Sequence, residues 1–397
     1  MKKILIIGAN WEQAPLLRKA KELGHYVIAT NPYSQGEGFK YSDKSYVVNP
    51  RDLTQIDEIF RKTRPDGVIA DECDYSMFTV AYLVNKYRLS GPSMDSLIIT
   101  NNKYLQRKMG LRAAIMQPEF RLCMTYKEVK TAVKELDLPV MLKPLDNRGS
   151  IGVSRVIKKG DLEGAFFRTI ANSHGRQMLV EKLVKGHVVT VEGLYLNRFI
   201  NLSFSTKKMH PQYPDNAMFL RYPGNLRSKV IKKLYKINEK IVKACQINFG
   251  VTHSEFIVDG EKINFLEIAN RGGGVHISNL IIPAITGIDV CKLLINSAMG
   301  KDFSLKGVSR KTRSNFALLH FFDFGKGKVI KIKNLNKATK LNGVLALRLN
   351  FKPGDFLADI KTAVNRPGFV IVVGKTLEEC NLIISKIEET LKIEFFK

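Results

Sequence analysis

A lysine followed by a glycine-bearing turn is the first feature of the sequence that suggests chemistry. Lys143 ends an apolar run, and the polar stretch after it contains Gly149, Ser150, Gly152 and Val153. Glycines let backbone N–H groups approach an anion closely, and the lysine adds an ammonium group at the strand end beneath the turn. This combination suits a polyphosphate, although an ordinary β-hairpin with a surface lysine has the same pattern.

Two glutamates on a predicted hairpin could hold a divalent cation. Glu255 and Glu267 fall at corresponding places on strands expected over 249–258 and 262–269, with a turn at Asp259-Gly260. Facing carboxylates repel each other unless a cation lies between them. Mg²⁺ prefers few carboxylates together with phosphate oxygens, so this pair suits a site beside a triphosphate. The alternative is two surface glutamates on a strand.

The lysine and glycine stretch, together with segments 178–186, 252–256 and 264–274, resembles the ATP-grasp superfamily of the carboxylate–amine ligase type. The resemblance covers roughly residues 100–300 and is closest to the branch of biotin carboxylase, phosphoribosylamine–glycine ligase and L-amino-acid ligase. It implies an α/β protein of the ATP-grasp fold, with an N-terminal doubly wound pre-ATP domain and a small C-terminal lobe. The expected domains are 1–92, 93–300 (small lobe about 110–180, large lobe about 181–300) and 301–397.

The resemblance also implies roles for individual residues, with ATP as nucleotide and Mg²⁺, or Mn²⁺, as metal. The phosphates would contact Lys103, Lys143 and the 149–153 turn. The adenine edge would contact the segment made of Glu181, Lys182, Leu183 and Val184.

Two positions depart from the family pattern. Val188 stands where the family commonly has a ribose-binding glutamate, and the adjacent His187 is expected to take over that contact. Asn270 is expected as a third metal ligand beside Glu255 and Glu267, although it lies one position later than in the family. Arg271 keeps its family position and is expected, with Lys143, to stabilise the transferred phosphoryl group.

The elements that must position these residues follow from hydrophobic periodicity. The segment 3–70 alternates buried strands with amphipathic helices, which predicts a doubly wound sheet. Asp71, Glu72 and Asp74 follow its last strand, where they would either form a substrate site or cap a helix. Periodicity predicts a single helix over 95–109. The family resemblance implies that the irregular cationic segment 205–225 is a lid, unless it is simply a disordered basic loop, and that the turn at 365–368 faces the site.

Composition sets broader limits. The 397 residues contain 63 Lys and Arg against 37 Asp and Glu, a net charge of +26. Either the surface is simply rich in solvated lysine, or it favours an anionic partner. The five cysteines are far apart without a C-x-x-C pair, which indicates reduced thiols in a cytoplasmic protein. No membrane span is expected.

The leading hypothesis is an ATP-dependent ligase that joins a small-molecule carboxylate to an amine through an acyl phosphate. The partners would be these substrates and a possible second copy of the chain. One alternative is a bicarbonate-activating carboxylase of the same fold. Another is a non-catalytic, nucleotide-regulated module that binds nucleic acid, although no nucleic-acid-binding motif is present.

Overall fold

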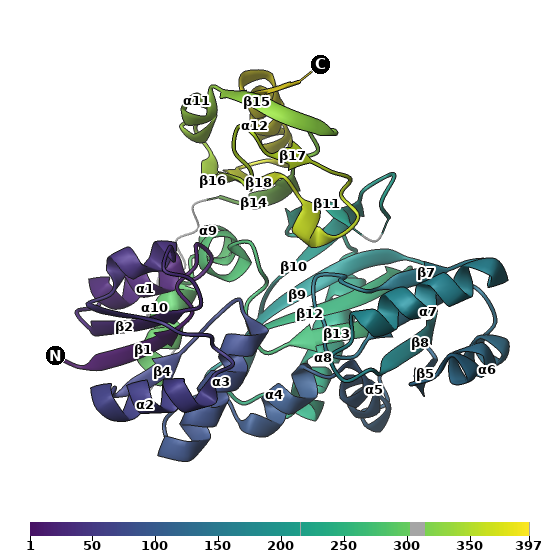
Figure 1. Cartoon of the computed structure of the whole chain (residues 1–397), viewed down its shortest axis with the longest axis horizontal. Helices are drawn as coiled ribbons and strands as arrows, with labels where there is room; N and C mark the ends of the chain where they lie inside the picture. Colours follow the sequence, from purple (N-terminus) through teal and green to yellow (C-terminus); the bar gives the residue numbers. More distant parts are fainter. Residues whose placement is uncertain (215, 302–313, 397) are drawn as a thin grey trace.

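The computed structural model describes residues 1–214, 216–301 and 314–396. Figure 1 shows an N-terminal domain and a small lobe at opposite ends of a central sheet, with a C-terminal lobe above them. Among the described residues, no single helix is long and apolar enough to cross a membrane; only the pair 277–286 and 290–298, bent by 118°, passes that test together.

The N-terminal domain has a parallel four-stranded sheet in the order β3-β2-β1-β4. Its elements are β1 (Lys3–Ile7), α1 (Ala14–Glu22), β2 (Tyr26–Asn31), η1 (Glu37–Tyr41), β3 (Lys44–Val47), α2 (Leu53–Thr63), β4 (Gly67–Ile69) and α3 (Asp74–Tyr87). Ile4 and Ile6 pack against α1, while Leu5 and Ile7 pack against α2 and α3. Alternate residues of one strand thus enter two cores, which confirms the doubly wound prediction.

The predicted helix over 95–109 is wrong, because the structure has two helices there. These are α4 (Met94–Thr100) and α5 (Lys103–Arg112). Asn101 is the C-cap of α4 and Asn102 is the N-cap of α5, where its Oδ1 accepts hydrogen bonds from the N–H groups of Tyr104 and Leu105. The break places Lys103 at the first position of α5.

The small lobe is a four-stranded sheet in the order β5-β8-β6-β7, covered by two helices. Its elements are β5 (Phe120–Cys123), α6 (Tyr126–Leu136), β6 (Val140–Pro144), β7 (Ser154–Val156), η2 (Lys159–Asp161), α7 (Leu162–Ala171) and β8 (Met178–Lys182). α6 begins at a capping box formed by Thr125 and Glu128. The turn between β6 and β7 is the predicted glycine turn.

One eight-stranded sheet joins the large lobe to the C-terminal lobe, in the order β13-β12-β9-β10-β11-β14-β18-β16. Its large-lobe strands are β9 (His187–Tyr195), β10 (Phe199–Met209), β11 (Ala217–Tyr222), β12 (Gly250–Asp259) and β13 (Lys262–Ala269). The predicted irregular lid over 205–225 is therefore wrong, because most of it is the antiparallel pair β10–β11. Ser205, Lys207 and Met209 alternate with Thr206 and Lys208, which is strand periodicity in a polar sequence.

Helices cover this sheet from both sides. They are α8 (Ser228–Ala244), the irregular turn η3 (Ile277–Ile281), α9 (Ile282–Thr286) and α10 (Val290–Ala298). α10 packs against β4 and α1 of the N-terminal domain, so late residues of the large lobe complete the N-terminal core.

The C-terminal lobe contributes three of the strands of the eight-stranded sheet and has a small sheet of its own. Its elements are β14 (Phe316–Phe321), β15 (Gly327–Lys333), α11 (Leu335–Thr339), β16 (Val344–Leu349), β17 (Phe356–Leu357), η4 (Ala363–Asn365), β18 (Gly368–Gly374), α12 (Leu377–Thr390) and β19 (Lys392–Phe395). Thr376 caps α12, and its Oγ1 accepts from the N–H of Glu379. The predicted domain limits at 92 and 300 stay predictions; residues 302–313 of the third domain lie outside the described residues.

Candidate active site

The large cavity, of about 490 Å³, lies between the small-lobe strands and the eight-stranded sheet. One part of its wall is apolar and includes Met141, Leu183, Val188, Ile257 and Leu266. Its other lining residues include most of the predicted set, namely Lys103, Lys143, Gly149, Ser150, Val153, Glu181, Lys182, Val184, Glu255 and Glu267. A partly apolar cavity of this size with a few charged groups is typical of a small-molecule site.

Two predicted phosphate-binding lysines reach the cavity from different elements. Lys103 Nζ donates to the carbonyl oxygen of Asn147 at 2.7 Å and lies 3.2 Å from Glu267 Oε2. Lys143, on β6, lies with its Nζ 2.6 Å from Glu181 Oε2. Each ammonium is thus held in place by an acceptor while it lines the cavity.

Glu181 serves as a buried counter-ion rather than as a free acceptor. Its second oxygen, Oε1, accepts from Arg107 Nε at 2.7 Å, and both side chains are 1% exposed. Burial alone would raise the Glu181 pKa, but the charges of Arg107 and Lys143 outweigh burial and lower it to about 2. The sequence analysis missed Arg107, although its place four residues after Lys103 puts both on one face of α5.

Glu255 and Glu267 lie directly opposite each other on β12 and β13, as the hairpin prediction required. Glu255 Oε1 accepts from Lys207 Nζ and lies 3.5 Å from His253 Nε2, and Glu267 pairs with Lys103. Burial would raise the Glu255 pKa, but Lys207 and His253 lower it far below its usual value. The side chains of Lys207, His253 and Lys103 therefore already neutralise this carboxylate pair. Two carboxylates together with phosphate oxygens form a set of ligands that suits Mg²⁺.

Asn270 does not belong with this pair. Its side chain is buried and does not line the large cavity, and its Nδ2 donates to the carbonyl oxygens of Phe249 at 2.8 Å and Val251 at 3.2 Å. Its Oδ1 accepts from Ser96 Oγ at 3.1 Å. Because the amide is engaged within the protein, the structure argues against the predicted metal-ligand role; the one-residue shift from the family pattern was the signal.

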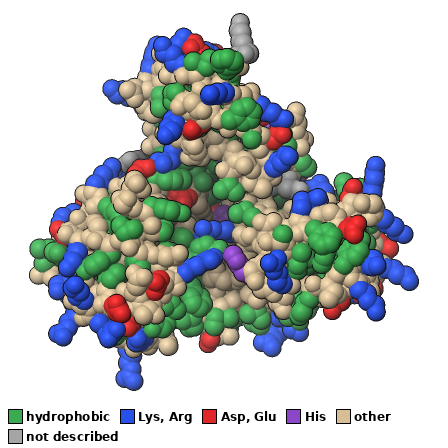
Figure 2. Space-filling view, viewed as in Figure 1, with side chains coloured by type: hydrophobic (Ala, Val, Ile, Leu, Met, Phe, Trp, Pro, Cys, Tyr) green, Lys and Arg blue, Asp and Glu red, His purple; other side chains and the backbone are tan. Residues whose placement is uncertain are grey.

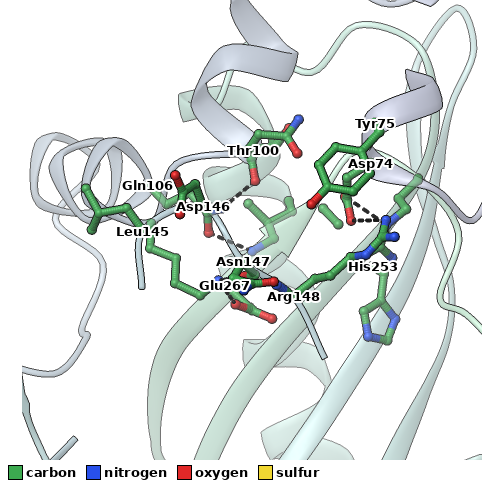
Figure 3. A pocket seen from close by; sticks show the side chains of 15 residues that line it. Asp74, Tyr75, Thr100, Gln106, Leu145, Asp146, Asn147, Arg148, His253 and Glu267 are labelled. Atoms are coloured by element: carbon green, nitrogen blue, oxygen red, sulfur yellow. Dashed lines mark hydrogen bonds and ion pairs between the residues drawn. The ribbon is translucent and has the colours of Figure 1, made fainter. Parts of the chain in front are cut away.

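A small cavity of about 60 Å³ adjoins the large one and shares Lys103, Asn147, Arg148 and Glu267 with it. Figure 3 shows polar side chains from several elements around this cavity, among them Asp74, Asn147, Arg148 and Glu267, whereas the His253 ring points away from them. Arg271 lines this cavity and not the large one.

Arg271 is fixed before any substrate arrives. Its Nε donates to Asp74 Oδ1 at 2.8 Å and its Nη1 donates to the carbonyl oxygen of Gly272 at 2.9 Å. Burial lowers the Arg271 pKa, but Asp74 more than compensates and raises it above its ordinary value. Asp74 is thus an arginine partner in the site, and the N-cap position of α3 belongs to Cys73.

The other two acidic residues of the β4 end support the turn after Arg271. Asp71 accepts from the Gly272 N–H and from Ser278 Oγ, both at 2.7 Å. Glu72 Oε1 accepts from Ser278 Oγ at 3.0 Å and from Asn279 Nδ2 at 2.9 Å. Burial raises the pKa of both carboxyls, that of Glu72 most, because the charge of Glu12 adds to the burial.

Two predicted nucleotide-binding residues are not in the large-cavity lining. Val188 lines that cavity, whereas its neighbour His187 does not, because successive side chains of β9 point to opposite faces. The structure therefore argues against a ribose contact by His187. Gly152 has φ +76°, and a Cβ there would lie 2.5 Å from Asn172 Cβ. Glycine is therefore needed at this position because a side chain would not fit within the turn.

The C-terminal lobe contributes Ala363 and Arg366 to the large cavity, which agrees with the prediction that the 365–368 turn faces the site. The Arg366 guanidinium stacks on the Phe321 ring at 3.7 Å and donates to the carbonyl oxygen of Ala217 at 3.2 Å. Burial lowers its pKa to about 10, and the nearby Glu255 opposes that effect.

Among the described residues there is no group of three or more His, Cys, Asp or Glu that could hold a metal ion alone.

Comparison with known proteins agrees with this geometry. Residues 136–279 match the family model of the ATP-grasp domain, and residues 320–395 match that of the L-amino acid ligase C-terminal domain 2. A formate-dependent phosphoribosylglycinamide formyltransferase from Sulfurisphaera tokodaii is 22% identical over 386 residues, 95% of this chain and 94% of the relative.

Two solved structures share the fold over the whole chain. The L-amino acid ligase from Bacillus licheniformis has a TM-score of 0.85 at 19% identity and covers 100% of this chain and 99% of its own. The phosphoribosylglycinamide synthetase from Anaerococcus prevotii has a TM-score of 0.78 at 19% identity, with both chains covered completely. The resemblance and the fold class predicted from the sequence are confirmed.

Proposed function

We propose, from its membership of the ATP-grasp superfamily, that this protein is an ATP-dependent ligase that activates a carboxylate as an acyl phosphate for attack by an amine. The observation that carries the proposal is the meeting of Lys103, Lys143, Glu255 and Glu267 in one cavity with an apolar wall. The lysines suit a triphosphate, and the wall suits a purine.

The reaction requires two steps. A carboxylate oxygen attacks the γ-phosphorus of ATP, the bond to the β-phosphate oxygen breaks, and ADP leaves. The amine nitrogen then attacks the carbonyl carbon, the C–O bond to phosphate breaks, and the amine loses a proton. Phosphorylation is needed because a free carboxylate lacks a good leaving group.

Residues of this chain divide the work by position. Lys103, Lys143 and the backbone of the 149–150 turn hold the phosphates, and the 181–184 segment faces the purine. Arg271, already oriented by Asp74, stabilises charge on the transferred phosphoryl group from the small cavity.

The metal is part of the proposal. Glu255 and Glu267 would hold Mg²⁺, or Mn²⁺, and the ion would neutralise phosphate charge there.

The decisive test is substrate-dependent ADP release, measured with a panel of small carboxylates and amines. The names of the relatives place formate and L-amino acids first in that panel, and bicarbonate serves as the contrasting acid. Glu267→Gln should lower turnover at least a hundredfold, whereas Glu261→Gln, an exposed glutamate at the tip of the same hairpin, should leave it unchanged. Full turnover in Glu267→Gln, or turnover only with bicarbonate, would overturn the proposal.

Location and assembly are also proposals. The five free cysteines, four of them buried, support a reducing cytoplasmic setting. Homodimer formation is tested by light scattering at several protein concentrations.

A further inference from the structure

A second cavity lies on the reverse side of the strands that line the large cavity. This rear cavity, of about 470 Å³, shares Gly186, Val188, Lys207 and Met209 with the large cavity, and its own lining includes His187, Lys208, Phe219 and Arg221. It lies where β9, β10 and β11 meet the start of α12.

Strand register shows that the two cavities are on different faces. Thr206 pairs with Arg221, and Lys208 pairs with Phe219, so these four side chains share one face. Lys207 and Met209, which line both cavities, alternate with them along β10, so their side chains point to the other face. Arg221 pairs in turn with Leu318, which packs in the same cluster as Cys380 of α12.

The rear cavity has a single sign of charge. His187, Lys208 and Arg221 supply the basic groups of this face, and none of its described lining residues is acidic. Lys208 Nζ lies 5.5 Å from the centre of the Phe219 ring, and the Arg221 guanidinium lies 5.6 Å from that of Phe316. Neither cation has an ion-pair partner among the described residues. Arg221 Nε is buried and has no hydrogen-bond partner there.

A buried guanidinium nitrogen without a partner is costly, and an anion would satisfy it. The planar guanidinium suits the two oxygens of a carboxylate, sulfonate or phosphate. Phe219, Leu226 and Leu377 give the same cavity an apolar wall, and its volume is within the range of small-molecule sites.

We propose that the rear cavity binds an organic anion, a molecule with an apolar or aromatic body and at least one phosphate, sulfonate or carboxylate group. Arg221 and Lys208 bind the acidic group, and the apolar wall binds the body. This site is separate from the ligase chemistry proposed above and does not depend on it.

The test uses 8-anilinonaphthalene-1-sulfonate, an aromatic sulfonate whose fluorescence rises in apolar surroundings. The full-length protein is titrated with and without saturating magnesium AMP-PNP, whose own binding is measured separately. We expect one saturable site, with a dissociation constant that AMP-PNP leaves within twofold.

Arg221→Met and Lys208→Met should each raise that constant at least tenfold, and Arg221→Lys should raise it less. Lys240→Met, on the exposed face of α8, is the matched control and should change it less than twofold. Thermal unfolding of each variant shows that it is folded, and Lys208→Met changes only an exposed side chain. Binding that survives both methionine variants, or that AMP-PNP displaces, would overturn the proposal. Failure of substrate-dependent ADP release would not affect it.

Discussion

Glu181 is held between Arg107 and Lys143 in a part of the site that is closed to water, and this makes the arginine energetically important. Arg107→Met leaves a buried carboxylate with one cation, so we expect a loss of about 3–5 kcal/mol in the free energy of unfolding. Urea denaturation measures the loss. Arg121→Met removes a pair of the same length, 2.7 Å to Glu135, that is about half exposed, and should cost at most about 1 kcal/mol. Equal losses in the two variants would contradict the argument.

The same carboxylate gives the protein an acid-sensitive contribution to stability. The Glu181 pKa is about 2 in the folded chain and 4.5 for an ordinary glutamate. Between these values the unfolded chain binds the proton and the folded chain does not, so this stabilisation is complete above pH 4.5 and is lost as pH falls toward 2. Unfolding free energies of wild type and Glu181→Gln, measured from pH 5 to pH 3, should therefore converge as pH falls. A constant difference would contradict the assignment.

Arg366 tests whether the C-terminal lobe takes part in the reaction. The guanidinium lines the large cavity near Glu255, so Arg366→Met should lower substrate-dependent ADP release at least tenfold. Its stacking on Phe321 is largely kept by methionine, and the melting temperature should change little. Lys352→Met, an exposed change in the same lobe, is the control. Unchanged kcat and KM in Arg366→Met would show that the residue only packs.

At the scale of single residues, the sequence predicted those site residues that lie close together along the chain. Lys143 with its turn, and the paired Glu255 and Glu267, follow from strand periodicity. Arg107, Lys207 and His253 were not predicted as a set, because their meeting with acidic partners depends on contacts between elements far apart in the chain. The ribose contact was predicted for His187 without regard to its place on β9, where neighbouring side chains point to opposite faces of the sheet.

The glycine turn between β6 and β7 provides a prediction about an element. Both Gly149 and Gly152 have positive φ, but a Cβ at Gly149 meets nothing closer than Ala363 Cβ at 3.8 Å. A Cβ at Gly152 would lie 2.5 Å from Asn172 Cβ and 2.9 Å from Pro144 Cγ. Gly152→Ala should therefore destabilise the protein by roughly 1–3 kcal/mol, and more than Gly149→Ala does. Urea denaturation compares the two; a larger loss in Gly149→Ala would contradict the packing argument.

Elements with a clear apolar period were predicted well. α6 and α12 each begin at a threonine, Thr125 or Thr376, whose side chain caps the helix, and this signal can be read locally. The β10–β11 pair was predicted as an irregular lid, because its lysines and nearby prolines hide a two-residue period. The break at Asn101-Asn102 depends on a side-chain cap that a helical pattern does not exclude.

The only tryptophan of the chain reports on the contact between the N-terminal domain and the C-terminal lobe. Trp11 lies 5.0 Å from the His276 ring and 5.4 Å from the Phe369 ring, and Arg348 stacks on it at 4.8 Å while pairing with Glu37. Burial lowers the His276 pKa to about 4, so its ring is neutral at pH 7 and gains a proton below pH 4. Tryptophan fluorescence should fall with a midpoint near pH 4 as the imidazolium quenches it. An unchanged titration in His276→Gln would contradict this assignment.

Basic residues are distributed along the whole sequence. Figure 2 shows Lys and Arg side chains scattered over the visible face. That distribution agrees with a solvated lysine-rich surface. The lysines and arginines that we propose as ligand-binding residues are those that line the cavities.

The backbone hydrogen bonds from β13 to β16 run without interruption across two parts of the chain. Because hydrogen-bonded strands resist sliding past one another, we expect Glu255 and Arg366 to keep their relative positions. Lys143 and its turn belong to a separate sheet. We therefore expect that residues 120–182 move relative to the eight-stranded sheet when nucleotide binds, and small-angle X-ray scattering with and without nucleotide tests this.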